Sequence, residues 1–224
     1  ISDKGIEALA LSNTFPNINQ LLLNNNHIGD DGIYALSQSQ MFCNLESLFL
    51  ANNDLTTDSA ISISKSNTLT QLKTLDFNNN DIRSEGTKAL SRSINLKSIE
   101  YLDLGDNQVE TEGAAAIAES PYLKTLKSLR LNNNNIKDAG VVAIAKSKNF
   151  NFLENLYLEN ENWIHSEGAK ALANSKSFPL LRQLVLTLNV IGDDGALHLA
   201  EAKNFPSLKL LNVAGNKISS RGED

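Results

Sequence analysis

The sequence predicts an α/β solenoid, an elongated single domain over residues 1–224 in which one strand and one helix alternate along the chain. Three observations predict this fold class. A pattern of leucines and one asparagine recurs eight times, the copies are spaced 27 residues apart (28 in one case), and each copy contains a strand-like and then a helix-like stretch. A fixed period of about 20 to 50 residues is typical of solenoids.

The first half of each copy predicts a short strand followed by a turn. The pattern is Leu-x-x-Leu-x-Leu-x-x-Asn-x-Ile, and its first leucine defines frame position 1. The copies start near residues 18, 45, 72, 99, 126, 153, 181 and 208, with partial repeats at both ends of the chain. Side chains alternate across a strand, so the leucines at positions 4 and 6 face the core and positions 3, 5 and 7 face outward.

The asparagine at frame position 9 is interpreted as structural, because a buried amide can bond backbone groups of its own turn and of the next one. We call these residues the ladder asparagines. They are Asn26, Asn53, Asn80, Asn107, Asn134, Asn162, Asn189 and Asn216.

The second half of each copy predicts a helix of two to three turns. Position 13 carries Asp, Ser or Thr in every copy, which predicts that its side chain caps the helix that begins there. The following residue is usually acidic, which suits the positive end of a helix dipole. Position 15 is glycine in every copy except at Ser59, and small and aliphatic residues follow at helical spacing. The position-13 residues are Asp3, Asp30, Thr57, Ser84, Thr111, Asp138, Ser166, Asp193 and Ser220.

A single repeat cannot fold alone. Burial of about six large apolar side chains contributes on the order of 10 to 15 kcal/mol. Ordering the 27 residues of one repeat costs more, at about 1 to 2 kcal/mol per residue. Each repeat therefore needs its neighbours to complete its core.

These residues resemble the leucine-rich repeat family over essentially the whole chain, and specifically its ribonuclease-inhibitor-like subclass. The near-uniform period departs from the alternating period of the inhibitor itself, so the resemblance is to the subclass. It implies a right-handed horseshoe with parallel strands on the concave face and helices on the convex face. It also implies the binding of a protein partner, usually across the concave face, and seldom catalysis.

Composition narrows the class of partner. The net charge is −6, from 20 basic and 26 acidic residues, which disfavours nucleic acid and anionic membranes as partners. No apolar stretch approaches the roughly 18 residues of a membrane span. Because the chain begins and ends within a repeat and shows no polar caps, we expect a segment of a longer protein, and we expect it to be a monomer.

The number of cysteines indicates the redox state of the compartment in which the protein resides. The single Cys43 excludes an internal disulfide framework and favours a reducing compartment; we expect its side chain to be buried as a small apolar group. A cytoplasmic location is therefore predicted, or the host cytosol if the protein is a secreted bacterial effector. The Asn- and Lys-rich composition, typical of an AT-rich genome, makes a bacterial or protist origin attractive.

No catalytic or metal-binding arrangement is expected. His27 and His165 lie five repeats apart, which is about 24 Å at the spacing of neighbouring strands. The Asp-Asp-Gly runs at 30–32 and 193–195 lack the alternating ligands of a calcium loop. We therefore expect no enzyme activity, no cofactor and no metal.

Function is expected on the outward strand positions, where aromatic and charged residues lie next to each other, as they do in binding hot spots. Three neighbouring strands carry most of the candidates, and Phe49 and Asp76 extend them toward the N-terminus. The candidate partner-binding residues are Phe49, Asp76, Tyr101, Asp103, Arg130, Tyr157, Glu159 and Trp163.

The sixth copy contains one added residue, between Leu158 and Ile164, and the only Trp of the chain stands beside it. We expect Asn162 to keep the ladder role while the chain bulges before it. Two interpretations of Trp163 are open: its side chain folds over neighbouring apolar surface, or the bulge directs it at a partner.

The predicted function is a scaffold that recognises a protein partner on its concave face. One alternative is a regulator of a GTPase, because activators of Ran share this repeat subclass and Arg130 is the only arginine on the three outward positions. The other alternative is a passive arm that positions a domain outside this segment.

Overall fold

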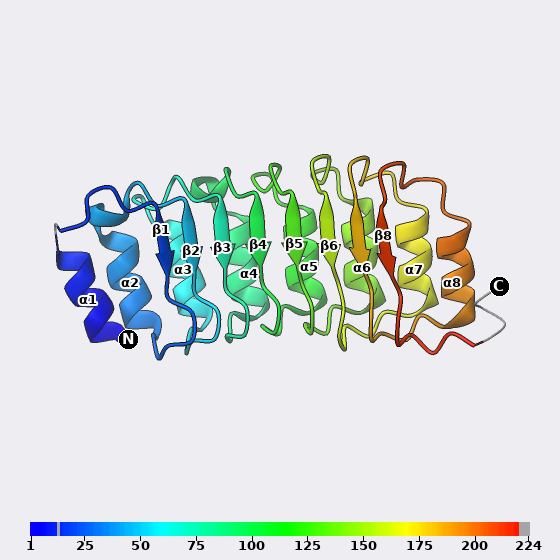
Figure 1. The fold of residues 1–224 in the computed structure, drawn as a ribbon, viewed down its shortest axis with the longest axis horizontal. Helices are drawn as coiled ribbons and strands as arrows, with labels where there is room; N and C mark the ends of the chain where they lie inside the picture. The colour runs from blue at the N-terminus through cyan, green and yellow to red at the C-terminus, as the bar shows by residue number, and fades with distance from the viewer. Residues whose placement is uncertain (13, 220–224) are drawn as a thin grey trace.

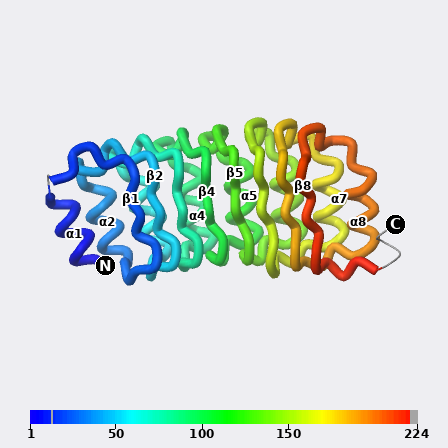
Figure 2. Tube along the Cα trace, viewed as in Figure 1, coloured from blue at the N-terminus to red at the C-terminus, as the bar shows by residue number. Residues whose placement is uncertain are grey.

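The computed structural model is an elongated solenoid of two layers, a sheet and a row of helices, and it describes residues 1–12 and 14–219 (Figure 1). Within these residues eight strands form one sheet in the order β1 to β8, and every neighbouring pair is parallel. The Cα trace shows the helices in a row behind the sheet (Figure 2), and a helix follows each strand from β1 to β7. The predicted α/β solenoid is confirmed.

The strands occupy frame positions 3 to 5 of their repeats, and the helices follow the turns. The strands are β1 (Gln20–Leu22), β2 (Ser47–Phe49), β3 (Thr74–Asp76), β4 (Tyr101–Asp103), β5 (Ser128–Arg130), β6 (Asn155–Tyr157), β7 (Gln183–Val185) and β8 (Leu210–Asn212). The helices are α1 (Asp3–Leu11), α2 (Asp30–Gln38), α3 (Thr57–Lys65), α4 (Arg83–Ser91), α5 (Glu110–Ala118), α6 (Lys137–Lys146), α7 (Ser166–Ala173) and α8 (Gly192–Ala200). Two short 3₁₀ turns are η1 (Gln40–Phe42) and η2 (Ile94–Leu96).

The strands pair so that equal frame positions lie side by side. Asp103 pairs with Arg130 between β4 and β5, and Arg130 pairs with Tyr157 between β5 and β6. The added residue in the sixth copy does not shift this register, since Asn155 still pairs with Gln183. Residues at one frame position therefore form a row across the whole sheet.

The core lies between the two layers. Leu48, Leu75 and Leu129 at position 4 are fully buried, and the Phe150 and Phe178 rings stack with their centroids 6.2 Å apart. The position-15 glycines let neighbouring helices pack closely. A Cβ on Gly86 would lie 3.0 Å from the Ala60 Cβ and 2.8 Å from the Ile82 side chain.

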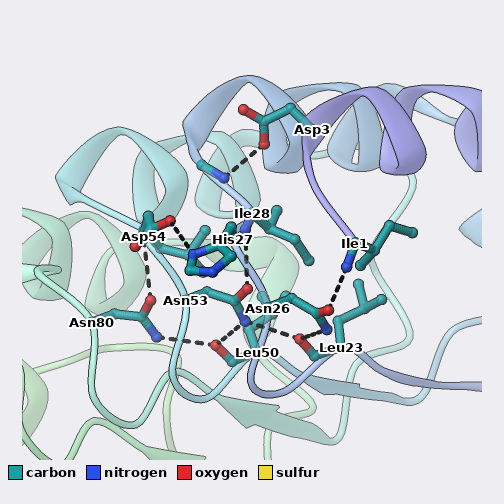
Figure 3. Close-up of polar contacts among 12 residues, drawn as sticks. Ile1, Asp3, Leu23, Asn26, His27, Ile28, Leu50, Asn53, Asp54 and Asn80 are labelled. Atoms are coloured by element: carbon teal, nitrogen blue, oxygen red, sulfur yellow. Dashed lines mark hydrogen bonds and ion pairs between the residues drawn. The ribbon is translucent and has the colours of Figure 1, made fainter.

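The ladder asparagines join each turn to the turn before it (Figure 3). The Asn53 Nδ2 group donates to the Leu50 carbonyl of its own turn at 3.0 Å and to the Leu23 carbonyl of the preceding turn at 2.9 Å. The Asn53 Oδ1 atom accepts from the Ile28 amide of the preceding turn at 3.1 Å. One side chain thus satisfies three backbone groups that no strand or helix pairs.

This ladder continues along the whole sheet, including the repeat with the added residue. Each later ladder asparagine donates across the repeat boundary to the carbonyl at position 6 of the preceding copy, at 2.7 to 3.0 Å. Asn162 donates to the Leu131 and Leu158 carbonyls at 2.7 and 3.1 Å. The added residue is therefore absorbed before the ladder and leaves it intact.

The turn residue at frame position 8 has a positive φ in every copy. Most of these residues are asparagine, aspartate or glycine, which adopt the left-handed conformation most readily. They are Asn25, Asn52, Asn79, Asp106, Asn133, Asn160, Leu188 and Gly215. In the sixth copy two consecutive residues, Asn160 and Glu161, have φ values of 58° and 46°, and this pair accommodates the added residue.

The predicted role of the position-13 side chains as caps of their own helices is wrong. Asp30 is the first residue of α2, and the cap of that helix is Gly29. The Asp30 Oδ1 atom instead accepts from the Thr56 and Ser59 amides at the start of α3, both at 3.0 Å. The helix starts one residue earlier than a cap at position 13 requires, so the side chain faces the next repeat.

The position-13 residues of other repeats also form hydrogen bonds to the next repeat. Asp138 in α6 accepts from the His165 and Gly168 amides at the start of α7, at 2.8 and 3.0 Å. Thr57 and Thr111 donate their hydroxyls to the Ile82 and Ile136 carbonyls of the next repeat. Ser220 lies outside the described residues.

The expected burial of Cys43 is also wrong. Cys43 is exposed at the end of η1. The buried place in this turn is taken by Phe42, which precedes Cys43 and is fully inaccessible to solvent.

Replacing Asn134 with Ala should lower the free energy of unfolding by about 3 kcal/mol, because buried backbone groups lose their partners. Asn134 is buried, donates to Leu104 and accepts from the Asn107 and Val109 amides. Urea unfolding measures the difference. Asn151→Ala is the control, since Asn151 is an exposed loop residue; equal losses in the two variants would contradict the ladder role.

Replacing Asp30 with Ala should cost about 1 to 2 kcal/mol at neutral pH, as the loss of a helix cap does. Burial raises the pKa of Asp30, but hydrogen bonds from Ser59 and Thr56 outweigh it and hold the pKa below its ordinary value. The stabilisation is therefore present above about pH 4 and disappears as the pH falls through the lowered pKa. Urea unfolding of both proteins across this range tests it, with the exposed neighbour Asp31→Ala as control; a difference independent of pH would refute the explanation.

Candidate protein-binding surface

All the candidate residues on the strands except Tyr101 form one continuous row on the outer face of the sheet, here called the sheet face. Strand register places the frame position 5 residues side by side from β2 to β6. The members of this row are Phe49, Asp76, Asp103, Arg130 and Tyr157. In the horseshoe expected from the family resemblance, this face is the concave one.

Four of the predicted residues touch each other in a chain of contacts across β4, β5 and β6. The Tyr101 hydroxyl donates to Asp103 Oδ2 at 3.0 Å, and the Arg130 Nε atom lies 3.8 Å from the same oxygen. The Arg130 guanidinium carbon lies 4.0 Å from the centroid of the Tyr157 ring, which is within the range of a cation–π interaction. These contacts hold two tyrosine rings and one arginine in fixed positions on an otherwise open surface.

The chain of contacts extends to a residue that the sequence did not single out. The Tyr157 hydroxyl donates to Gln183 Oε1 on β7 at 3.0 Å. Gln183 stands at frame position 3, and glutamine at an outward strand position is unremarkable in sequence. The strand register pairs Gln183 with Asn155, and only the folded side chains show that Gln183 reaches the tyrosine two residues further along β6.

Three carboxylates crowd around Arg130 with raised pKa values. Burial raises the pKa of Asp103, of Asp76 and of Glu159. A hydrogen bond from the Gly105 amide opposes the effect at Asp103, and one from the Asn78 amide opposes it at Asp76. The positive charge of Arg130 opposes the rise in pKa at all three carboxyl groups.

Two acceptor atoms at the end of this patch have no hydrogen-bond donor. The Asn132 Oδ1 and Glu159 Oε2 atoms are both buried and unpartnered. They belong to frame position 7 of neighbouring repeats, one on each side of the β5–β6 boundary. The same position in the preceding copy is Gly105, and a Cβ there would lie 2.4 Å from Asn132 Oδ1. The only sequence feature that points to this site is Gly105, the one glycine at an outward strand position. Its significance becomes clear only from its contact with Asn132 on the neighbouring repeat.

Trp163 lies at the edge of the sheet rather than on it. Trp163 is about half exposed (52%). It lines a groove of about 450 Å³ together with Asp106, Glu110, Glu161 and asparagine and glutamine residues of the turns after β3, β4 and β5. Of the sequence-predicted residues, Trp163 is therefore separate from the row on the strands, although Glu159 and the turn that follows it link the two.

The histidines stay apart, as the repeat spacing requires. His27 pairs with Asp54 and His165 pairs with Asp138, each at 3.3 Å, in different repeats. Across residues 1–12 and 14–219 no group of three His, Cys, Asp or Glu side chains could hold a metal ion. In the same residues no helix has both the length and the apolar character that a membrane crossing requires.

A family model described as Leucine Rich repeat matches residues 16–37, 68–91, 95–118, 122–145 and 179–200, just over half of the chain. The chain belongs to the leucine-rich repeat family. Domains of this family generally mediate protein–protein interaction, and the family is generally not enzymatic.

One solved structure shows a similar fold at low sequence identity. A protein from Bacteroides fragilis, solved by a structural genomics consortium, matches 97% of this chain with 18% identity and a TM-score of 0.55. The ectodomain of the plant membrane receptor kinase GASSHO1/SCHENGEN3 from Arabidopsis thaliana, in complex with CASPARIAN STRIP INTEGRITY FACTOR 2, matches 90% with 17% identity and a TM-score of 0.43. This chain spans 65% of the length of the first protein and 27% of the second. A search of curated proteins finds no match.

Replacing Glu159 with Gln should stabilise the fold at neutral pH and leave it unchanged in acid. Burial raises the pKa of Glu159 in the folded state, so its ionisation opposes folding. Below the ordinary pKa of about 4.3 the side chain at position 159 is neutral in both proteins. The difference in the free energy of unfolding between them should grow as the pH rises through the raised pKa of Glu159. Urea unfolding of both proteins at a series of pH values measures this. A difference that does not change with pH would contradict burial as the cause.

Proposed function

We propose that this chain is a protein-interaction scaffold that binds a protein partner through its sheet face. The observation that carries the proposal is the chain of contacts from Tyr101 through Asp103 and Arg130 to Tyr157. Phe49, Asp76 and Glu159 border these residues on the same face, and Trp163 stands at its edge. The strand and helix in each of the first seven repeats favour the ribonuclease-inhibitor-like subclass of the family.

The chemistry of this patch suits a binding hot spot. Tyrosine and arginine are enriched among the residues that dominate binding energy. Here their side chains are already held by one another, and Asp103 is buried with both carboxylate oxygens engaged. A partner therefore meets a preorganised surface and loses little side-chain entropy on binding.

The two alternative functions receive less support. A GTPase regulator of the kind considered above would need Arg130 to reach phosphate, but Arg130 is occupied by Tyr157 and Asp103. A passive arm would have no need for a preorganised aromatic and charged cluster on its open face. Both alternatives are therefore secondary to a binding surface.

Further properties follow from the same proposal. The net charge of −6 and the acidic patch favour a protein over nucleic acid or an anionic membrane. We propose that the chain acts as a monomer in the cytoplasm, or in the host cytosol as a bacterial effector. These assignments rest on charge and composition.

Replacing Tyr157 with Ala should weaken capture of the partner by about tenfold or more, as truncation of a hot-spot residue does. The measurement is quantitative affinity capture with the immobilised chain, followed by a Kd for each protein retained. Tyr34→Ala is the matched control, because Tyr34 is an exposed tyrosine on α2, away from the sheet face.

A partner that is lost with Tyr157→Ala and kept with Tyr34→Ala supports the proposal. Circular dichroism and urea unfolding establish that both variants are folded. Proteins retained equally by the wild type and by Tyr157→Ala, or lost only with Tyr34→Ala, would refute binding through the sheet face.

A further inference from the structure

We propose that the edge groove beside Trp163 binds a lysine- or arginine-bearing segment of the protein partner. The proposal rests on the proposed function and specifies which chemistry the partner brings to this edge. The groove lies on the turns between strand and helix in the third to sixth repeats, next to the Glu159 end of the sheet-face patch.

The groove combines an exposed aromatic ring with negative charge. Three carboxylate residues, Asp106, Glu110 and Glu161, contribute to its lining, and every other lining residue except Trp163 is asparagine or glutamine. None of the described residues that line it is basic. A cationic side chain that enters is therefore attracted and meets no like charge in the lining.

The protein itself does not neutralise these carboxylates. The Asp106 carboxylate accepts from the side-chain Nδ2 groups of Asn132 and Asn133, and Glu110 accepts from the Ser84 hydroxyl at 3.4 Å. Within residues 1–12 and 14–219 none of the three forms an ion pair with lysine, arginine or histidine. The amide donors orient Asp106 while leaving its charge in place.

Trp163 adds a cation-specific contact. Tryptophan has the most favourable ring face for lysine ammonium and arginine guanidinium groups. Trp163 is half exposed and lines the groove with Glu161, two residues away. The neighbouring carboxylates favour a cation over an apolar or acidic occupant.

The test uses the full chain and the fluorescence of Trp163, its only tryptophan. Acetylated, amidated hexa-arginine is titrated at low salt, with hexaglutamate as the opposite charge. Hexa-arginine should cause a saturable fluorescence change that weakens as salt is added, and hexaglutamate should cause none. Glu161→Gln should bind hexa-arginine about twofold to fivefold more weakly.

The control variant is Glu167→Gln, which changes the net charge equally at an exposed site on α7 outside the groove. It should bind hexa-arginine as the wild type does. Trp163→Leu, measured by calorimetry, should bind about twofold to fivefold more weakly. Urea unfolding establishes that each variant is folded.

No saturable change with hexa-arginine, an equal response to hexaglutamate, or equal affinities of Glu161→Gln and Glu167→Gln would overturn the proposal. Unchanged affinity of Trp163→Leu would overturn it as well. The capture experiment with Tyr157→Ala is independent of these titrations. If a partner is lost with Tyr157→Ala but hexa-arginine does not bind, this inference alone is refuted. If the partner is retained equally by the wild type and Tyr157→Ala, the proposed function is refuted.

Discussion

The whole structure depends on how the turn after each strand satisfies its backbone groups. The turn leaves carbonyl and amide groups that neither strand nor helix pairs, and unpaired buried groups of this kind are costly. The ladder asparagine of the next repeat binds the Leu23 carbonyl and the Ile28 amide in the first turn, and the pattern repeats along the sheet. The aspartates at the helix starts act in the opposite direction, since Asp30 holds the start of α3. Neighbouring repeats therefore stabilise each other reciprocally.

The structural role of some positions in each repeat determines where binding residues can stand. Inward strand positions, ladder positions and the helix interface are occupied by the scaffold, while the outward strand positions and the turns are free to vary. The row from Phe49 to Tyr157 and the groove beside Trp163 use these free positions. Strand register then turns residues 27 apart in sequence into direct neighbours, so a cluster forms without any change to the fold.

Periodicity predicted the architecture well because it indicates which side chains of each repeat face the core. The strands fall at the predicted outward and inward positions, and Asn162 keeps its ladder bonds despite the added residue. What the sequence could not show depends on geometry between repeats. Asp30 is a residue type that commonly caps helices, but only the offset between neighbouring helices shows that it binds the start of α3. The same limit applies to Gln183 and to the acceptor pair at Asn132 and Glu159.

The left-handed residue in each turn has a consequence for how this scaffold can change. In the sixth copy a second left-handed residue, Glu161, follows Asn160, and both the strand register and the ladder continue unaltered. Chain length can therefore vary at this point without disturbing the packing on either side. The other seven turns carry a left-handed residue at the same position, so we expect each of them to accept an added residue, and short loops grafted there would line one edge of the sheet.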